Sequence, residues 1–164
     1  MRMILTWDRD AEMLVAGSRR IRAWSQVRNE LNGLRPNLEK IKRGKSDVFY
    51  TTTASGERGV PSMPRPFPVG KWKILGIIPH PDRANDGYLW PFYIATDAWQ
   101  MLDEWELDSN GVYERKTGKR VPDYAYGLHF SSSDWTQGCI RIGSESDLRW
   151  LVEQVKPGDE FIVT

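Results

Sequence analysis

The sequence is divided into short runs of apolar and β-branched residues separated by turn residues, and this pattern constrains the fold most strongly. Three such runs open the chain, at 3–7, 12–16 and 19–24, with Gly17-Ser18 between the second and the third. Runs of this length predict strands, and their spacing predicts a meander. Further strands are expected at 48–53, 69–74, 88–95, 124–130, 139–142 and 160–164, with the strand at 88–95 interrupted at Pro91. Residues 99–107 fit either a strand or a helix.

One segment, residues 144–155, carries a full helix pattern. Ser144 is the expected N-cap, and Asp147 three residues later resembles a capping box. An apolar stripe follows, and Pro157-Gly158 ends the segment. Residues 26–41 also have helical spacing but contain Gly33 and Pro36, so we expect a short or broken helix there, or none.

The balance of these elements predicts a mainly β chain, a β-rich α+β fold with one firm C-terminal helix. The segment 55–68, rich in glycine and proline, is expected to be an ordered loop without ladder pairing. The 164 residues contain no internal repeat or linker, so we expect one domain, 1–164.

Charge and hydropathy narrow the function. With 23 basic and 22 acidic residues the formal net charge is +1, which argues against a protein that binds nucleic acid. No apolar run approaches the ~20 residues of a membrane span. The N-terminus lacks an apolar signal core. Three readings stay open: retention in the cytoplasm, export by a route that needs no cleaved signal, such as that of a secreted effector or a phage protein, and a sequence from which an N-terminal segment has been trimmed.

The single cysteine, Cys139, lies in Thr136-Gln137-Gly138-Cys139-Ile140-Arg141, ten residues after His129. A lone cysteine forms no internal disulfide and is too little for a cysteine metal site, so no metal or other cofactor is expected. It can act as a nucleophile when an imidazole stands beside it, because the imidazolium stabilises the thiolate and later returns a proton to the leaving group.

The expected geometry is two neighbouring strands joined like a hairpin. His129 would end the first strand and Cys139 would begin the second, so that their side chains meet. Ser131, Asp134 or a main-chain carbonyl could orient the imidazole. The N–H of Cys139 or of Gly138 could donate to a developing oxyanion. On residue type alone, a lone cysteine is more often a small buried apolar residue than a nucleophile, and a lone histidine is more often a surface or structural residue.

The run from His129 to Arg141 resembles the active-site motif of the L,D-transpeptidase (YkuD-like) catalytic domain: a histidine, a variable loop, then Ser/Thr-His-Gly-Cys, an apolar residue and Asn or Arg. Residues 66–72 resemble the family's Pro-x-Gly-x-aromatic strand entry, and residues 144–163 its final helix and strand. The similarity runs from about residue 60 to the end of the chain, with the sharp motif confined to 127–143. Two departures are Gln137 in place of the second histidine and a shorter loop.

The resemblance implies a YkuD-like β-sandwich or mixed sheet and acyl transfer on peptidoglycan stem peptides, as an L,D-transpeptidase or L,D-carboxypeptidase. Cys139 would form the acyl-enzyme, with His129 as base and Gly138 at the oxyanion side. The substrate side would include four further residues: Thr136, Trp135, Gln137 and Arg141. Action at the cell wall or in the periplasm is implied, with stem peptides as partners and an immunity or delivery partner left open.

Two alternatives remain open at this point. The chain could be an inactive or weakly active cell-wall or phage-type binding module, with Gln137 as the trace of lost activity, or a cytoplasmic cysteine amidase acting on other substrates. Slow alkylation of Cys139 at neutral pH would favour the binding module.

Overall fold

In the computed structural model, the chain is described at residues 2–25, 49–52, 58–62, 65–86, 89–107, 113–124, 126–131, 136 and 138–164. It falls into two compact units: Met1–Gln26, Pro66–Ala98 and Tyr126–Thr164 form unit 1, and Val27–Arg65 with Trp99–Ala125 form unit 2. The expectation of a single domain stays a prediction. Within the described residues no helix is long and apolar enough to cross a membrane.

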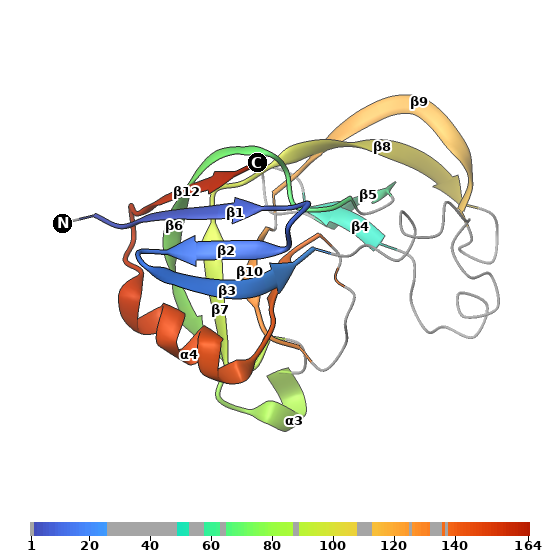
Figure 1. Cartoon of the computed structure of the whole chain (residues 1–164). Coiled ribbons are helices and arrows are strands. Elements are labelled where there is room, and N and C mark those ends of the chain that lie inside the picture. Colours follow the sequence, from blue (N-terminus) through green and yellow to red (C-terminus); the bar gives the residue numbers. More distant parts are fainter. Residues whose placement is uncertain are drawn as a thin grey trace. The chain divides into compact units, whose positions relative to one another are not determined.

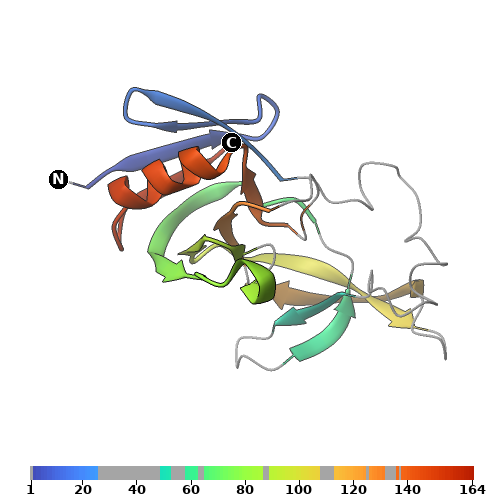
Figure 2. The same cartoon turned by 90° about the horizontal axis from the view of Figure 1, so that it is seen from below.

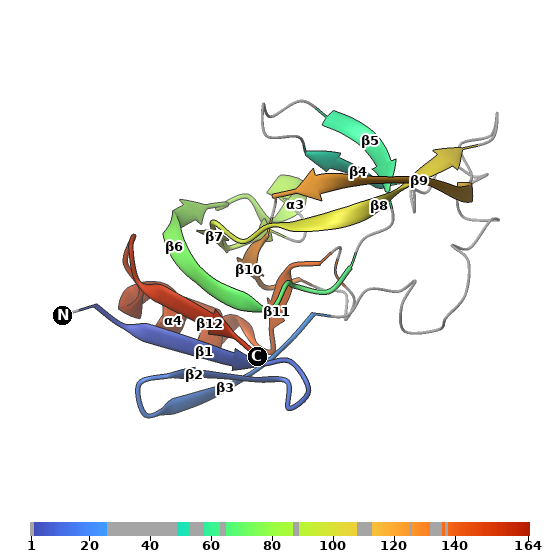
Figure 3. The same cartoon turned by 90° about the horizontal axis from the view of Figure 1, so that it is seen from above.

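Unit 1 is a closed barrel in the order β1-β12-β6-β7-β10-β11-β3-β2 (Figure 1). Its strands are β1 (Ile4–Asp8), β2 (Met13–Ala16), β3 (Arg19–Trp24), β6 (Gly70–Pro79), β7 (Phe92–Thr96), β10 (Gly127–His129), β11 (Ile140–Ile142) and β12 (Glu160–Val163). The first three form the predicted meander, paired antiparallel. Figure 3 shows β12, the last strand, between β1 and β6; it runs parallel to β1. The expected mainly β fold is confirmed, with its mixed strands closed into a barrel.

The barrel interior follows the two-residue period of its strands. Alternate residues of β1 are exposed and buried, with Leu5 and Trp7 fully buried. Phe67 lies at the centre of the aromatic core, with its ring centroid 6.2 Å from that of Trp7, 5.6 Å from Tyr126 and 5.5 Å from Phe161. The segment before β6 therefore contributes the ring of Phe67 to the core.

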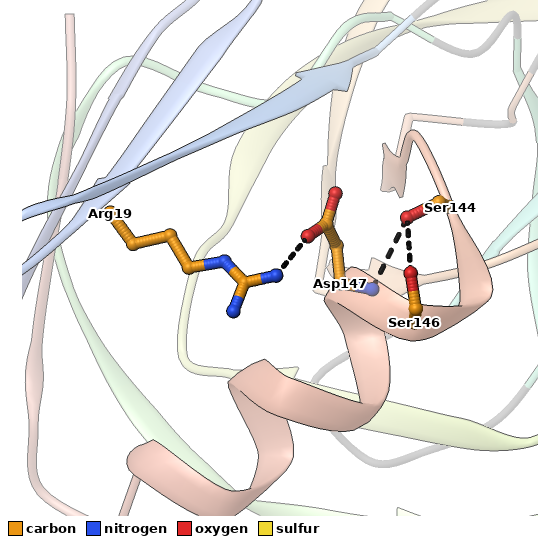
Figure 4. Close-up of polar contacts among 4 residues, drawn as sticks. All are labelled: Arg19, Ser144, Ser146 and Asp147. Carbon is orange, nitrogen blue, oxygen red and sulfur yellow. Dashed lines mark hydrogen bonds and ion pairs between the residues drawn. The ribbon is translucent and has the colours of Figure 1, made fainter.

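The predicted C-terminal helix is α4 (Glu145–Gln154), which contacts β7 and β11. Figure 4 shows its N-terminus: Ser144 Oγ accepts a hydrogen bond from Asp147 N at 3.2 Å, as expected of the cap. The Asp147 carboxylate is used differently from a capping box, because its Oδ1 accepts from Arg19 Nη2 at 2.7 Å. Asp147 thus links α4 to β3 through its carboxylate, while Ser144 accepts from one N–H of the first turn of the helix.

One described element of unit 1 differs from expectation. The polar segment after β6 contains a short helix, α3 (Arg83–Asp86), which follows an Asp82 side chain that accepts from Ala84 N and Asn85 N. The strand expected at 88–95 was predicted to be interrupted at Pro91, and β7 begins directly after that proline. Proline lacks the N–H that a ladder needs, so the strand starts beyond it.

Unit 2 is a four-stranded sheet in the order β4-β5-β8-β9, seen in Figure 2 as a pair of teal and green strands and a pair of yellow and brown ones. Its strands are β4 (Phe49–Thr52), β5 (Arg58–Ser62), β8 (Gln100–Leu107) and β9 (Tyr113–Asp123). Residues 99–107 are thereby assigned to a strand.

The expectation of a loop without ladder pairing at 55–68 is wrong for β5, which pairs antiparallel with β4. Pro61 is accommodated opposite Tyr50, and the register with β8 is at Ser62, beyond the proline. A strand can carry proline where that residue's N–H is not needed by a neighbour. The possible helix at 26–41 lies outside the described residues.

Candidate active site

His129 and Cys139 belong to neighbouring strands, but these strands are parallel. The register pairs Leu128 with Ile140 and His129 with Arg141. The hairpin-like arrangement expected from the sequence is therefore wrong. The short connection suggested a turn, but each strand instead finds a separate antiparallel partner on its other side, β7 for β10 and β3 for β11.

The parallel register sets His129 beside Arg141. Alternate residues of a strand share a face, and paired residues on adjacent strands point the same way. Leu128, Ile140 and Ile142 enter the core, so His129 and Arg141 point away from it. Cys139 lies one residue before β11, in the bend that leads into the strand. It is therefore two residues along the chain from the register partner of His129.

His129 lies in a row of four paired residues that crosses β7, β10, β11 and β3. The register joins Tyr93 to His129, His129 to Arg141, and Arg141 to Trp24. Although it points away from the barrel core, His129 is only 3 % exposed. The row gives the imidazole a phenol on one side and a guanidinium on the other.

This environment lowers the pKa of His129 to about 4, chiefly because burial disfavours the charged ring. A hydrogen bond with the Phe130 main chain raises the pKa and the positive charge of Arg141 lowers it further. Of the candidates for orienting the imidazole, a main-chain group therefore contributes, whereas Asp134 lies outside the described residues. The imidazole is neutral at pH 7, which is the form that accepts a proton.

The residue before Cys139 is held at both of its main-chain polar groups. Gly138 N donates to Thr136 Oγ1 at 3.2 Å, and Gly138 O accepts from Ser25 Oγ at 2.9 Å. Gly138 has a φ of +117°, in the region that favours glycine. Cys139 itself is partly exposed. The backbone at the sulfur is therefore fixed while the thiol stays within reach of solvent.

Arg141 is buried, at 8 % exposure, and is bound mainly to the chain itself. Its Nε donates to Ser131 O at 3.0 Å, and its Nη1 donates to Ile142 O at 3.3 Å and Gly143 O at 3.4 Å. Its guanidinium carbon lies 4.8 Å from the ring centroid of Trp24 and 4.8 Å from that of Phe130. These contacts tie the start of the connection after β10 to β11.

The structure therefore places Cys139, His129, Gly138, Thr136 and Arg141 around the start of β11. Trp135, Gln137 and Asp134 lie outside the described residues. Sequence reasoning missed Ser25, Tyr93 and Trp24. Trp24 and Tyr93 come from β3 and β7, and Ser25 directly follows β3. For Trp24 and Tyr93 the only sequence signal is membership of predicted strands, and nothing in the sequence indicates that any of the three contacts the motif.

Tyr93 has a further neighbour in the site, Gly127. A Cβ added to Gly127 would collide with the ring and hydroxyl of Tyr93 and lie 2.5 Å from the carbonyl oxygen of Ile94. The phenol of Tyr93 therefore lies over Gly127. Gly127 directly precedes Leu128, and Cys139 directly precedes Ile140, the register partner of Leu128. Glycine at 127 is what allows the phenol to lie there.

Comparison with known proteins gives one family. The family model described as the YkuD L,D-transpeptidase catalytic domain matches residues 36–163. A search of curated proteins gave no match.

Solved structures similar to the chain include three L,D-transpeptidases. That of L,D-transpeptidase 1 from Mycobacterium tuberculosis has 15 % identity and a TM-score of 0.43, covering 99 % of this chain and 59 % of that one. The L,D-transpeptidase (residues 123–326) from Xylanimonas cellulosilytica DSM 15894 has 17 % identity and a TM-score of 0.45, covering 99 % and 60 %. The L,D-transpeptidase (Yku) from Stackebrandtia nassauensis has 16 % identity and a TM-score of 0.39, covering 100 % and 56 %. The chain spans less than two thirds of each.

Proposed function

We propose, since this chain belongs to the YkuD L,D-transpeptidase catalytic domain family, that it catalyses acyl transfer on peptidoglycan stem peptides through Cys139. The observation that supports the proposal is the parallel register of β10 and β11, which pairs a neutral, buried His129 with Arg141, two residues after a partly exposed Cys139. A neutral imidazole beside a reachable thiol is the pair that nucleophilic catalysis requires.

In the proposed reaction, the sulfur of Cys139 attacks a carbonyl carbon of the stem and the C–N bond beyond it breaks. The thiol proton passes to His129 and from there to the departing amine. The product is a thioester on Cys139. An amine then takes the acyl group, which forms a cross-link, or water takes it, which gives the carboxypeptidase outcome; either step regenerates the thiol.

The remaining residues have supporting roles in this proposal. Gly138 and Thr136 shape the turn at the oxyanion side, where Thr136 Oγ1 already accepts from Gly138 N. Arg141 holds the connection in place through main-chain carbonyls, and its bonds to Ser131, Ile142 and Gly143 favour this over direct contact with substrate. Trp135 and Gln137 are proposed to face the stem peptide. The family acts on the cell wall, and we place this activity there.

Mass spectrometry of the intact protein mixed with purified muropeptides tests the proposal. We expect an added acyl mass on Cys139 in the unmodified protein. C139A should show no adduct and no turnover, and H129Q should acylate much more slowly while remaining folded by circular dichroism.

The other functions give different results in the same assay. Binding of muropeptides without an adduct or turnover would identify a binding module. Turnover of generic peptides as fast as of muropeptides would identify an amidase of another kind. Full turnover by C139A would remove cysteine catalysis altogether.

A further inference from the structure

Ser25 is the last described residue after β3, and it bridges two distant segments of unit 1. Its hydroxyl oxygen lies 2.9 Å from Gly138 O and 2.9 Å from Phe67 N. A main-chain N–H can only donate and a carbonyl can only accept, so the directions of both bonds are fixed. The hydroxyl accepts from Phe67 and gives its proton to Gly138.

The hydrogen bond that the Ser25 hydroxyl accepts comes from a residue anchored in the barrel core. Phe67 is fully buried and packs its ring on Trp7, Tyr126 and Phe161. It lies between Pro66 and Pro68, and the proline after it restricts its backbone to extended conformations. The N–H that holds the Ser25 hydroxyl is therefore itself held in place.

The hydrogen bond that the Ser25 hydroxyl donates fixes the peptide group between Gly138 and Cys139. The peptide bond from Gly138 to Cys139 is trans, so its C=O and N–H point in opposite directions. Because Ser25 holds the C=O, it also sets the direction of the Cys139 N–H, which points away from Ser25. The neighbouring Gly138 N–H is directed to Thr136 Oγ1 instead.

We infer that Ser25 is a positioning residue which orients the Cys139 N–H as the oxyanion donor of this site. The inference rests on the proposed function, since an oxyanion forms only when a carbonyl is attacked. The motif leaves two main-chain N–H groups as possible oxyanion donors, those of Cys139 and Gly138. The inference selects the N–H of Cys139. Ser25 acts through the peptide group and touches no reacting atom.

Two reactions of the one cysteine in the chain separate this role from a general structural one. Alkylation by iodoacetamide is a displacement at a saturated carbon and forms no oxyanion, whereas acylation by a stem tetrapeptide forms one. The rate constants of both are measured by intact-protein mass spectrometry. We expect S25A to slow acylation about tenfold to hundredfold, less than or equal to the effect of losing a whole oxyanion donor, and to change alkylation by less than about threefold.

Matched variants control for stability. S25T and S25V have side chains of nearly the same shape, and only threonine keeps the hydroxyl; acylation should survive in S25T and fall in S25V, even if S25A does not fold. T96V removes a hydroxyl with the same pattern elsewhere, since Thr96 Oγ1 donates to Tyr126 O at 2.7 Å and accepts from Ala98 N at 3.3 Å. The ratio of acylation to alkylation should be unchanged in T96V.

Each result bears on one claim. Equal rates in S25T and S25V, or a parallel fall of acylation and alkylation in S25V, would overturn the role of Ser25 while leaving the proposed function intact. A fall of the ratio in T96V as large as in S25V would also overturn it. Absence of any acyl adduct in the unmodified protein would overturn the proposed function, and the role of Ser25 with it.

Discussion

Burial of His129 makes the stability of this protein depend on pH in a defined window. The folded-state pKa is about 4, against about 6.5 in the unfolded chain. Between these values the unfolded state binds a proton that the folded state excludes, so the free energy of unfolding falls as pH decreases. The loss is about 2 kcal/mol at pH 5 relative to pH 7.5, and it approaches about 3 kcal/mol below pH 4.

The assay is urea unfolding followed by tryptophan fluorescence at several pH values from 7.5 to 4.5. Carboxyl groups also titrate in this range, so the informative quantity is the difference between the unmodified protein and H129Q. This difference should change by about 2 kcal/mol between pH 7.5 and pH 5, with H129Q the less sensitive of the two. H80Q removes the other histidine and should retain the pH dependence, because His129 is still present.

A pH dependence that is the same in H129Q and in the unmodified protein would refute the reasoning. The imidazole would then titrate in the folded state much as in the unfolded chain, and burial beside Arg141 would not exclude its proton. A pH dependence of opposite sign would show that His129 carries a charge-stabilising partner in the folded protein.

Further predictions concern the packing around the site. G127A should cost about 1–3 kcal/mol in unfolding free energy, because its Cβ would meet Tyr93 and the Ile94 carbonyl oxygen; G76A, whose Cβ meets nothing within 4 Å, is the matched control, and equal costs would contradict this. S144A should cost about 1 kcal/mol in unfolding free energy through loss of the α4 cap, measured by urea unfolding, and no change would mean that water replaces the cap. F67A should lower the unfolding free energy by about 3–5 kcal/mol. It should also slow acylation in any folded fraction, because Phe67 supports Ser25. Full acylation by folded F67A would show that the packing of Phe67 in the core does not affect the site.

The sequence allowed the local elements to be predicted because each carries its own physical signal. Alternation at β1 to β3 and the cap and stripe of α4 are properties of neighbouring residues. The segment holding β5 was misread because prolines argue against ladders, whereas one proline can be tolerated at a suitable position. Local pattern shows that a segment is a strand and leaves its partners undetermined.

Strand direction at the site illustrates the same limit. A short connection between β10 and β11 suggests a hairpin, and the local residues contain no sign that β7 and β3 take the antiparallel positions. The residues of the motif could nevertheless be named from the sequence, because the motif is local, whereas the pairing of His129 with Cys139 stays a prediction. Ser25 could not be named, since it lies 113 residues from Gly138 and meets it only after the barrel closes.

The neutral state of His129 also changes how reactivity at Cys139 should be interpreted. An imidazole whose pKa is about 4 is neutral at pH 7, so in the resting protein His129 supplies no positive charge that would stabilise a thiolate. Transfer of the thiol proton to this ring is unfavourable by itself, and it becomes favourable only as negative charge develops nearby on sulfur and on the attacked carbonyl.

Iodoacetamide supplies no oxyanion and no substrate contacts, so slow alkylation is expected of an active enzyme with this geometry as well as of a binding module. Slow alkylation therefore does not distinguish the two, contrary to the expectation from the sequence alone. Reaction with an acyl donor distinguishes the two, because acylation requires both the base at His129 and the donor N–H at Cys139. A protein that only binds stem peptides would form no acyl adduct.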